Sequence, residues 1–198
     1  MVNANIQQPF MTPLTLNFKK VLRTRTIDFE QEFDRAYCLD IVNALNKLIE
    51  YDKVMKTPKH LLKVRFNIFS YGGQCDAFIA LAHKIEEMQS MGYFVHTHNI
   101  SMCASCGFML SIMGDYKTAN EYARYLNHQI SAGVIGTFGE METTTEEVRR
   151  FQETFRQIVK KHCPNVSDVE LDRPYVTNRD ITYSAKEAVE VGFIDEII

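Results

Sequence analysis

The sequence lacks any apolar run of about 18 residues, the length that a membrane-spanning helix requires, so no membrane association is expected. Its first twenty residues contain no basic stretch followed by an apolar segment, so no secretory signal is expected there. Cysteine is scarce, odd in number and scattered, which argues against a secreted disulfide scaffold. The five cysteines are Cys38, Cys75, Cys103, Cys106 and Cys163. These absences together predict a soluble, cytoplasmic protein with reduced cysteines.

An excess of charge of either sign is also missing. The chain has 22 Lys and Arg against 25 Asp and Glu, which gives no electrostatic basis for nucleic acid as the main partner. Its 198 residues, 45% of them hydrophobic, are enough for one globular domain with a buried core. We expect that domain over residues 23–198, after an arm or loop over residues 1–22, where no periodicity is visible.

What the sequence does contain is an alternation of helical and strand patterns. Apolar residues from Phe33 to Ile49 fall on one helical face. The segment LLKVRFNIF (61–69) alternates apolar and polar residues, as in a strand with one solvent-exposed face. Later patterns predict a helix over 78–88, a strand over 93–100, a short buried helix over 104–113 and a strand over 122–128.

The strongest helical pattern covers about residues 143–163. Thr143 and Thr144 each precede a glutamate by three residues, so each could open this helix with a capping box. Basic residues over 160–162 suit the negative end of the helix dipole, and Pro164 stops the helix.

A second capping-box pattern, SAKE (184–187), predicts a short helix that stops at Gly192. The segment FIDEII (193–198) then predicts a final strand. Strands that alternate with helices in this way predict an α/β domain with right-handed crossovers.

Ser105, in SMCASCGFML (101–110), follows a predicted strand and precedes a predicted helix. Backbone N–H groups at a helix start lack helical partners, so the amide of Cys106 could stabilise negative charge beside Ser105. Gly72 and Gly73 form a second turn from strand to helix, where the backbone can approach a bound carbonyl. The alternatives are structural: Ser105 as a helix N-cap or small packing residue, and the glycines as a plain turn.

A serine nucleophile needs a base within hydrogen-bonding reach and an acid that orients the base. His128 ends a predicted strand near the same edge of the sheet, where ligands of open α/β sheets gather. Several carboxylates follow, among them Asp172, Asp180 and Glu187, and periodicity alone selects none of them.

His96, His98, Cys103 and Cys106 form a rival group, because H-x-H and C-x-x-C are spacings found at zinc sites. The connection between the two pairs is short, however, and CASC runs into an apolar helix. We therefore favour cysteines that pack as small buried hydrophobes, with a zinc-binding interaction module as an alternative.

Taken in order, four segments resemble the Clp-type proteolytic subunits (ClpP), a family of serine peptidases, over about residues 25–198. The segments are FNIFSYGGQCDAFIALAHKIEEM (66–88), ISMCASCGFMLSIMG (100–114), YLNHQ (125–129) and NRDITYSAKEAVEVGFIDEII (178–198). The order of serine, histidine and aspartate at these separations is the most specific part of the likeness.

The resemblance implies an α/β fold of the ClpP/crotonase-like type, a spiral of β-β-α units from which a helical handle protrudes. The handle helix would be the one at about 143–163, and ISAGVIGTFGE (130–140) would be a handle strand that lines up substrate. Residues 1–22 would be an N-terminal arm or axial loop.

The resemblance also implies the site. Ser105 would be the nucleophile, His128 the general base and Asp180 the residue that orients the base. The backbone N–H groups of Gly73 and Cys106 would form the oxyanion hole.

The implied function is a serine endopeptidase that cleaves unfolded polypeptides inside a homo-oligomer of stacked heptameric rings. The implied partner is an AAA+ unfoldase driven by ATP. This chain has no P-loop motif, so we do not expect it to bind ATP itself. No cofactor or metal is implied.

Two positions depart from the family pattern. Tyr71 stands where the family usually has proline before its glycine pair, and Cys106 stands where methionine usually follows the nucleophile. Because both flank the implied oxyanion hole, a catalytically inert ring subunit with a structural or regulatory role is an alternative. A crotonase-type acyl-CoA enzyme, which shares the spiral fold and paired oxyanion amides but needs no serine, is another.

Overall fold

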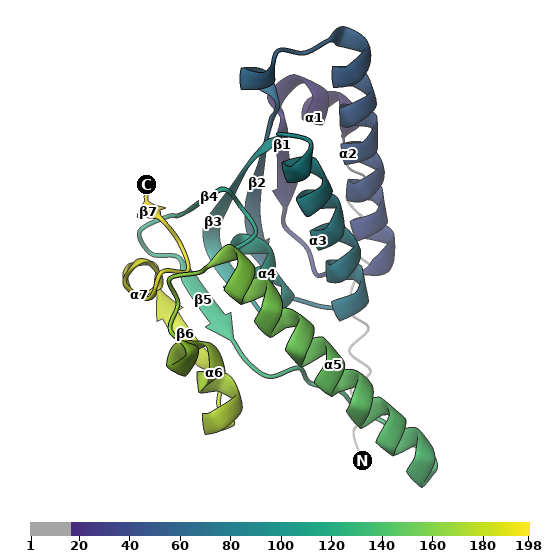
Figure 1. Cartoon of the computed structure of the whole chain (residues 1–198), viewed down its shortest axis with the longest axis vertical. Helices are drawn as coiled ribbons and strands as arrows, with labels where there is room; N and C mark the ends of the chain where they lie inside the picture. Colours follow the sequence, from purple (N-terminus) through teal and green to yellow (C-terminus); the bar gives the residue numbers. More distant parts are fainter. Residues whose placement is uncertain (1–16) are drawn as a thin grey trace, which may run out of the picture.

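The computed structural model of the protein describes residues 17–198 (Figure 1). The helices are α1 (Phe18–Thr24), α2 (Arg35–Met55), α3 (Cys75–Ser90), α4 (Cys106–Ser111), α5 (Phe138–His162), α6 (Asp168–Thr177) and α7 (Ala185–Val191), with a 3₁₀ turn at Lys59–Leu61. The strands are β1 (Thr26–Phe29), β2 (Lys63–Ser70), β3 (Phe94–Ala104), β4 (Tyr116–Ala119), β5 (Arg124–Asn127), β6 (Ile181–Ser184) and β7 (Glu196–Ile197). The predicted α/β class is confirmed.

The strands form one sheet with a main path β1-β2-β3-β4-β7, in which every pair is parallel. Along one edge, β3 pairs with two strands in succession: His96–Asn99 pair with β4, and Met102–Ala104 pair with β5. β6 then pairs antiparallel with β5. The C-terminal end of β3, which leads to Ser105, therefore lies beside β5 rather than β4.

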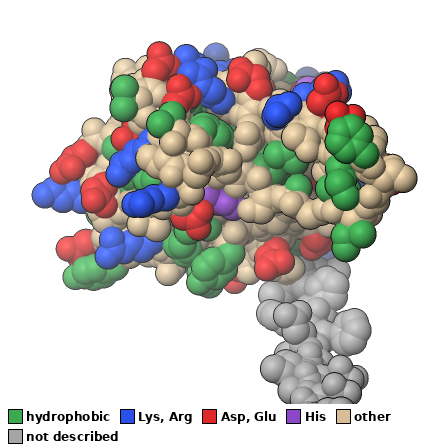
Figure 2. All heavy atoms as spheres, turned by 90° about the horizontal axis from the view of Figure 1, so that it is seen from below, with side chains coloured by type: hydrophobic (Ala, Val, Ile, Leu, Met, Phe, Trp, Pro, Cys, Tyr) green, Lys and Arg blue, Asp and Glu red, His purple; other side chains and the backbone are tan. Residues whose placement is uncertain are grey.

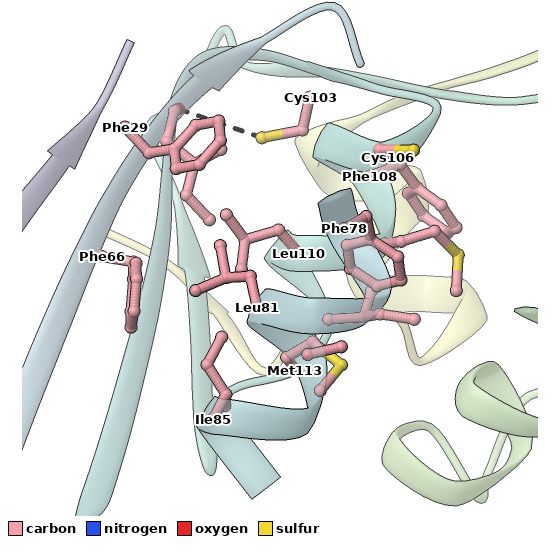
Figure 3. Packing of buried hydrophobic residues seen from close by; sticks show 14 of the residues in the cluster. Phe29, Phe66, Phe78, Leu81, Ile85, Cys103, Cys106, Phe108, Leu110 and Met113 are labelled. Carbon is pink, nitrogen blue, oxygen red and sulfur yellow. Dashed lines mark hydrogen bonds between the residues drawn. The ribbon is translucent and has the colours of Figure 1, made fainter. Parts of the chain in front are cut away.

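Helices α2 and α3 pack side by side along the sheet (Figure 1). β2 turns Val64, Phe66 and Ile68 into the core and leaves the residues between them exposed or half-buried, which confirms the predicted alternation. Figure 3 shows α4 within this core, with Phe108 and Leu110 close to Phe78 and Leu81 of α3. The start of α4, and with it Ser105, is thus fixed by packing from several elements.

On the face seen in Figure 2, basic and acidic side chains are interspersed with apolar ones, as the near-neutral composition predicts. Within residues 17–198, no helix is both long and apolar enough to cross a bilayer.

The long helix begins earlier than predicted. α5 starts after Thr137, whose amide donates to the Glu140 carboxylate at 2.6 Å while its hydroxyl accepts from the Glu140 amide at 3.4 Å. The predicted caps Thr143 and Thr144 lie inside the helix, where each hydroxyl donates 2.9 Å to the carbonyl four residues earlier. A threonine hydroxyl can either cap a helix or bond back to the preceding turn, so the T-x-x-E pattern alone could not choose between these positions.

The handle strand implied for residues 130–140 is not present. Residues 128–137 are neither helix nor strand, and the segment from residue 138 belongs to α5. A strand needs a neighbour for its hydrogen bonds, and within residues 17–198 no strand pairs with this segment. The N-terminal end of α5 projects away from the sheet (Figure 1), in agreement with the implied helical handle, and its C-terminal half returns to the core, where Phe155 and Val159 are buried.

Part of the expected N-terminal arm is structured. Residues 18–22 belong to α1, which Asn17 caps by accepting a hydrogen bond from the Lys20 amide at 3.2 Å. Val21 is the buried residue that ties α1 to the core, and one buried residue gives no visible period. Residues 1–16, the remainder of the expected arm, lie outside the described residues.

Asp52, near the C-terminal end of α2, is buried among hydrogen-bond donors. Its carboxylate accepts two bonds from the Arg25 guanidinium, at 2.8 and 2.5 Å, and one each from the Tyr93 and Thr57 hydroxyls, at 2.7 Å. Burial alone would raise the pKa of the Asp52 carboxyl, but these hydrogen bonds outweigh it and hold the pKa below its ordinary value.

We predict that Asp52→Asn lowers the free energy of unfolding by about 2–4 kcal/mol at neutral pH, because Arg25 loses its charged partner. A carboxyl whose pKa is lowered on folding stabilises the protein above its unfolded pKa of about 3.9, and loses that contribution as the pH falls through its folded pKa. Urea unfolding across acidic and neutral pH should therefore show a wild-type loss of stability in acid that the variant lacks. Asp40→Asn, at an exposed position of the same helix, is the matched control, and an equal loss there would contradict the assignment.

Candidate active site

Ser105 occupies the single residue between β3 and α4, and its backbone has an unusual conformation, with φ 54° and ψ −123°. The other non-glycine residues with positive φ in the described part of the chain lie in the left-handed region at helix C-termini: Arg25, Lys56 and Asn178. The Ser105 amide donates to the Leu126 carbonyl of β5 at 3.0 Å, which holds the turn against the sheet. Strained backbone at a sharp turn from strand to helix is characteristic of a serine presented for nucleophilic attack.

The N-cap alternative for Ser105 is not supported. Ser105 precedes the first residue of α4, but its side chain makes no capping hydrogen bond. The hydroxyl is therefore not committed to the helix start, and glycine would adopt the positive φ of this turn with less strain than serine.

The turn at Gly72 and Gly73 packs directly against Ser105. Gly72 has φ 108°, and a Cβ there would lie 2.6 Å from the Ser105 Cβ and 3.1 Å from its Oγ. Gly73 has φ 141°, and a Cβ there would lie 2.6 Å from backbone atoms of Phe33. The glycines are thus required both for their conformations and for close approach, which is more than a plain turn needs.

Two backbone amides point to an oxyanion site. The bridge to Phe33 uses the Gly72 carbonyl and the Gln74 amide, each at 2.7 Å, and within residues 17–198 the Gly73 amide has no backbone partner. The Cys106 amide is the first of α4 and has no partner within the helix. The Cys106 thiol donates to the Gly73 carbonyl at 3.5 Å, which holds the two segments together.

Gly107 allows α4 to begin this close to β2. A Cβ at Gly107 would lie 2.6 Å from the carbonyl oxygen of Ser70. Ser70 in turn donates its hydroxyl to the Gln31 carbonyl at 2.6 Å and accepts from the Gly72 amide at 3.2 Å. Ser70 therefore contacts both the segment that carries the nucleophile and the glycine turn.

His128 directly follows β5, and it lines the same cavity as Ser105. The cavity has a volume of about 20 Å³, room for about one water molecule. Asp180 directly precedes β6. Because Asn127 pairs with Ile181 in the antiparallel ladder, His128 and Asp180 are the next two positions in register. The structure thus brings Ser105 and His128 to one cavity and places Asp180, at an exposed position, next to His128 in the ladder.

Hydrogen bonds among the three candidate side chains are absent from the described part of the chain. Such bonds are often long or misaligned in unliganded enzymes and tighten when substrate binds.

Gln129 fastens the segment that carries His128 to α6. Its side-chain amide donates to the Pro174 carbonyl at 3.2 Å and to Asn178 Oδ1 at 2.7 Å. Asn178 ends α6 and lies two residues before Asp180. This contact therefore fixes the distance between the two turns that carry His128 and Asp180.

The remaining walls of the cavity are mostly apolar, and the sequence did not reveal them. They come from α4, α5, α6 and the segment after His128: Met109, Ile130, Phe155, Val159, Leu171 and Tyr175. Leu171 and Tyr175 have helical spacing, and Ser167 caps α6 by accepting from the Glu170 amide at 3.2 Å. The spacing of Leu171 and Tyr175 and the capping serine are the two features of the sequence from which α6 could have been predicted.

The residues of the zinc alternative are not brought together. His96 and His98 both contact the Thr118 hydroxyl, at 2.8 Å, whereas the Cys103 thiol faces the β2 backbone in the core (Figure 3). Cys106 lies on the Gly73 side of α4. Within residues 17–198 there is no group of three potential metal ligands, so the structure gives the zinc alternative no support.

Comparisons with known proteins give matches over most of the chain. The model of a family described as "Clp protease" matches residues 14–198. The chain is 28% identical over 183 residues to ATP-dependent Clp protease proteolytic subunit 2 of Thermobifida fusca, covering 91% of this chain and 83% of that protein. It is 26% identical over 188 residues to the same subunit of Chlamydia abortus, with coverage of 91% and 83%, and 27% identical over 184 residues to that of Rhodococcus jostii, with coverage of 91% and 87%.

Proposed function

The chain belongs to the Clp protease family, and on that premise we propose that it is a serine endopeptidase that cleaves unfolded polypeptides inside an oligomeric ring. The observation that carries the proposal is the strained turn that presents Ser105 to the cavity shared with His128. The relatives are named as proteolytic subunits, which favours this reading over a crotonase-type acyl-CoA enzyme.

In the proposed reaction, Ser105 Oγ attacks the carbonyl carbon of a peptide bond. His128 takes the hydroxyl proton and then gives it to the departing amine, while Asp180 orients the imidazole and stabilises its charge. Water, activated by His128, then hydrolyses the acyl-enzyme and restores the free serine.

The negative oxygen of the tetrahedral intermediate would accept hydrogen bonds from the Gly73 and Cys106 amides. One such donor typically contributes about 3–4 kcal/mol to stabilisation of the transition state. The contact between the Cys106 thiol and the Gly73 carbonyl supports this role, because it holds the two donors in a fixed relation.

The proposed partners are further copies of this chain and an ATP-driven unfoldase. Exposed apolar side chains gather at the start of α5 and in the segment before it: Val134, Ile135, Phe138 and Met141. Apolar groups in such a cluster favour contact with another chain, which supports stacked rings. The relatives' names include ATP dependence, whereas this chain has no P-loop motif, so the ATPase would be a separate protein.

Covalent labelling with a fluorophosphonate tests the proposal directly. We expect an adduct on Ser105 of the wild-type assembly, mapped by peptide mass, and labelling at least about 100-fold slower in His128→Ala, because the base is lost. His83→Ala, which removes an exposed histidine of α3, is the matched control and should label at the wild-type rate.

An unlabelled wild-type assembly would instead favour the inert ring subunit. The absence of a hydrogen bond between Ser105 and His128 among the described residues is the observation that keeps this second candidate open. Ring assembly without labelling, measured by mass photometry on the same sample, is the result it predicts.

A further inference from the structure

A second pocket, separate from the candidate active site, lies at the C-terminal end of α2. Its lining comes from residues within 49–62 and 91–93, and we call it the α2 pocket. Its volume is about 360 Å³, within the range of ligand pockets in proteins. Among the described residues it shares no lining with the cavity of Ser105 and His128. The end of α2 also lies at the opposite end of the molecule from the start of α5 (Figure 1).

The uncharged polar groups of the α2 pocket are engaged with a carboxylate. The hydroxyls of Thr57 and Tyr93 each donate to Asp52, at 2.7 Å, so neither proton is left for a ligand. Asp52 also accepts two hydrogen bonds from the Arg25 guanidinium, which balances its negative charge. The pocket therefore has an acidic residue in its wall without a net negative charge there.

The rest of the wall is apolar apart from lysines. Ile49 and Leu62 are half-buried, and Met91 keeps 49% of its surface exposed. Apolar surface that stays open to water at a concave site is stabilised when an apolar group covers it. The body of a ligand that fits here must therefore be apolar.

Three exposed lysines supply positive charge at the same place. Lys53 and Lys56 line the pocket, and Lys59 reaches the turn after Met91, since a Cβ at Gly92 would lie 3.6 Å from Lys59 Cε. Within residues 17–198, none of these three ammonium groups is in an ion pair. The dipole of α2 favours Lys53 in the last turn of that helix, but it does not account for Lys59 in the 3₁₀ turn.

We propose that the α2 pocket binds a medium-chain alkyl carboxylate. The alkyl chain would cover the apolar wall, and the carboxylate would accept hydrogen bonds from the lysine ammonium groups. An inorganic anion would leave the apolar wall in water, and a neutral alkyl compound would leave the lysines without a partner. The volume has room for about twelve water-sized groups, which is the number of non-hydrogen atoms in decanoate. This inference does not depend on the proposed function.

Isothermal titration calorimetry of the assembled protein with hexanoate, octanoate and decanoate tests the proposal. We expect one site per chain and a Kd that falls about fourfold for each added methylene group, because each buries a similar apolar area. Decan-1-ol and decyltrimethylammonium have the same chain length but no charge or the opposite charge. Both should bind at least about tenfold more weakly than decanoate, and added salt should weaken decanoate binding.

Two variants separate the contributions of charge and of space. Lys53→Met/Lys56→Met removes two charges while keeping long side chains, and should raise the Kd for decanoate at least about tenfold with little effect on decan-1-ol. Met91→Trp should fill the pocket from an exposed position and abolish binding of both compounds. Lys186→Met, at an exposed position of α7, is the matched control and should bind decanoate as the wild type does. Urea unfolding of each variant checks that it is folded.

Equal affinity for decanoate and its two chain-length controls would overturn the proposal, as would an unchanged Kd in both pocket variants. Exposed apolar residues near the pocket suggest a lipid surface as the other occupant to test: Val54, Met55 and Leu61. Cosedimentation with vesicles of phosphatidylcholine and phosphatidylglycerol is therefore the second measurement. Decanoate binding without cosedimentation is the expected result, and cosedimentation without decanoate binding would overturn the proposal in favour of a membrane surface.

Discussion

Replacing Ser105 by alanine should lower kcat for hydrolysis of a short peptide at least about 10⁴-fold, with little change in the unfolding midpoint. The large effect is expected because the hydroxyl is the only group proposed to form a bond to substrate, and what remains is stabilisation by the amides and by binding. Little change in stability is expected because the side chain makes no capping hydrogen bond. Steady-state kinetics with a fluorogenic peptide, and urea unfolding of the same samples, measure the two quantities.

A double variant tests whether Ser105 and His128 act together in the reaction. If Ser105 and His128 act as one unit, then Ser105→Ala/His128→Ala should be no slower than Ser105→Ala alone, since the base has no function without the nucleophile. Ser101→Ala, at an exposed position of the same strand, is the matched control and should retain wild-type kinetics. Hydrolysis by Ser105→Ala at more than about one per cent of the wild-type rate would refute the assignment of the nucleophile.

Replacing Gly72 by alanine should reduce hydrolysis about 10²–10³-fold, although Gly72 contributes no side chain to the reaction. The new methyl group would lie 2.6 Å from the Ser105 Cβ, so either the nucleophile or the glycine turn with its Gly73 donor must shift. The substitution also places a side chain at φ 108°, which should cost about 1–3 kcal/mol of stability. Peptide hydrolysis and urea unfolding of one preparation separate the two effects.

Gly139→Ala is the control for the glycine effect. Gly139 lies in the first turn of α5, and a Cβ there meets no atom within 4 Å. Alanine should therefore leave hydrolysis unchanged and raise stability by up to about 1 kcal/mol. Wild-type hydrolysis by Gly72→Ala would show that the glycine turn does not set the position of Ser105.

The turn around Ser105 could be predicted because its determinants are local. A strand pattern, small residues and an apolar helix follow one another within 20 residues, and the glycine pair follows its own strand in the same way. The close approach of Gly72 to Ser105 depends on the pairing of β2 with β3, including the register shift between Ile68 and Ser70, which no local pattern encodes. The family resemblance, rather than periodicity, predicted that the glycine turn and the Ser105 turn belong to one site.

The choice of the carboxylate that orients His128 depends even more on contacts between distant segments. Periodicity could not select among Asp172, Asp180 and Glu187. In the structure Asp172 accepts hydrogen bonds from Arg156, and Glu187 completes the cap of α7, so both are already engaged. Asp180 lies next to His128 because β6 is antiparallel to β5, a pairing between segments more than 50 residues apart.

The missed elements have identifiable causes. α6 contains Pro174 in its interior, and an internal proline normally counts against a helix. β1, β4 and β6 have four residues each, too few to show an alternation. The start of α5 was missed because Thr137 and Thr143 carry the same capping pattern.

The way β3 divides its partners has a consequence for biosynthesis. The Ser105 amide is held by Leu126 of β5, and β5 is in turn completed by β6, at residues 181–184. A nascent chain that has left the ribosome only as far as α5 therefore carries the serine and β5, but neither β6 nor Asp180. Because synthesis proceeds from the N-terminus, the candidate site can be assembled only after β6 has emerged. If the proposed function is correct, incomplete chains would therefore be unable to hydrolyse other nascent chains on the same polysome.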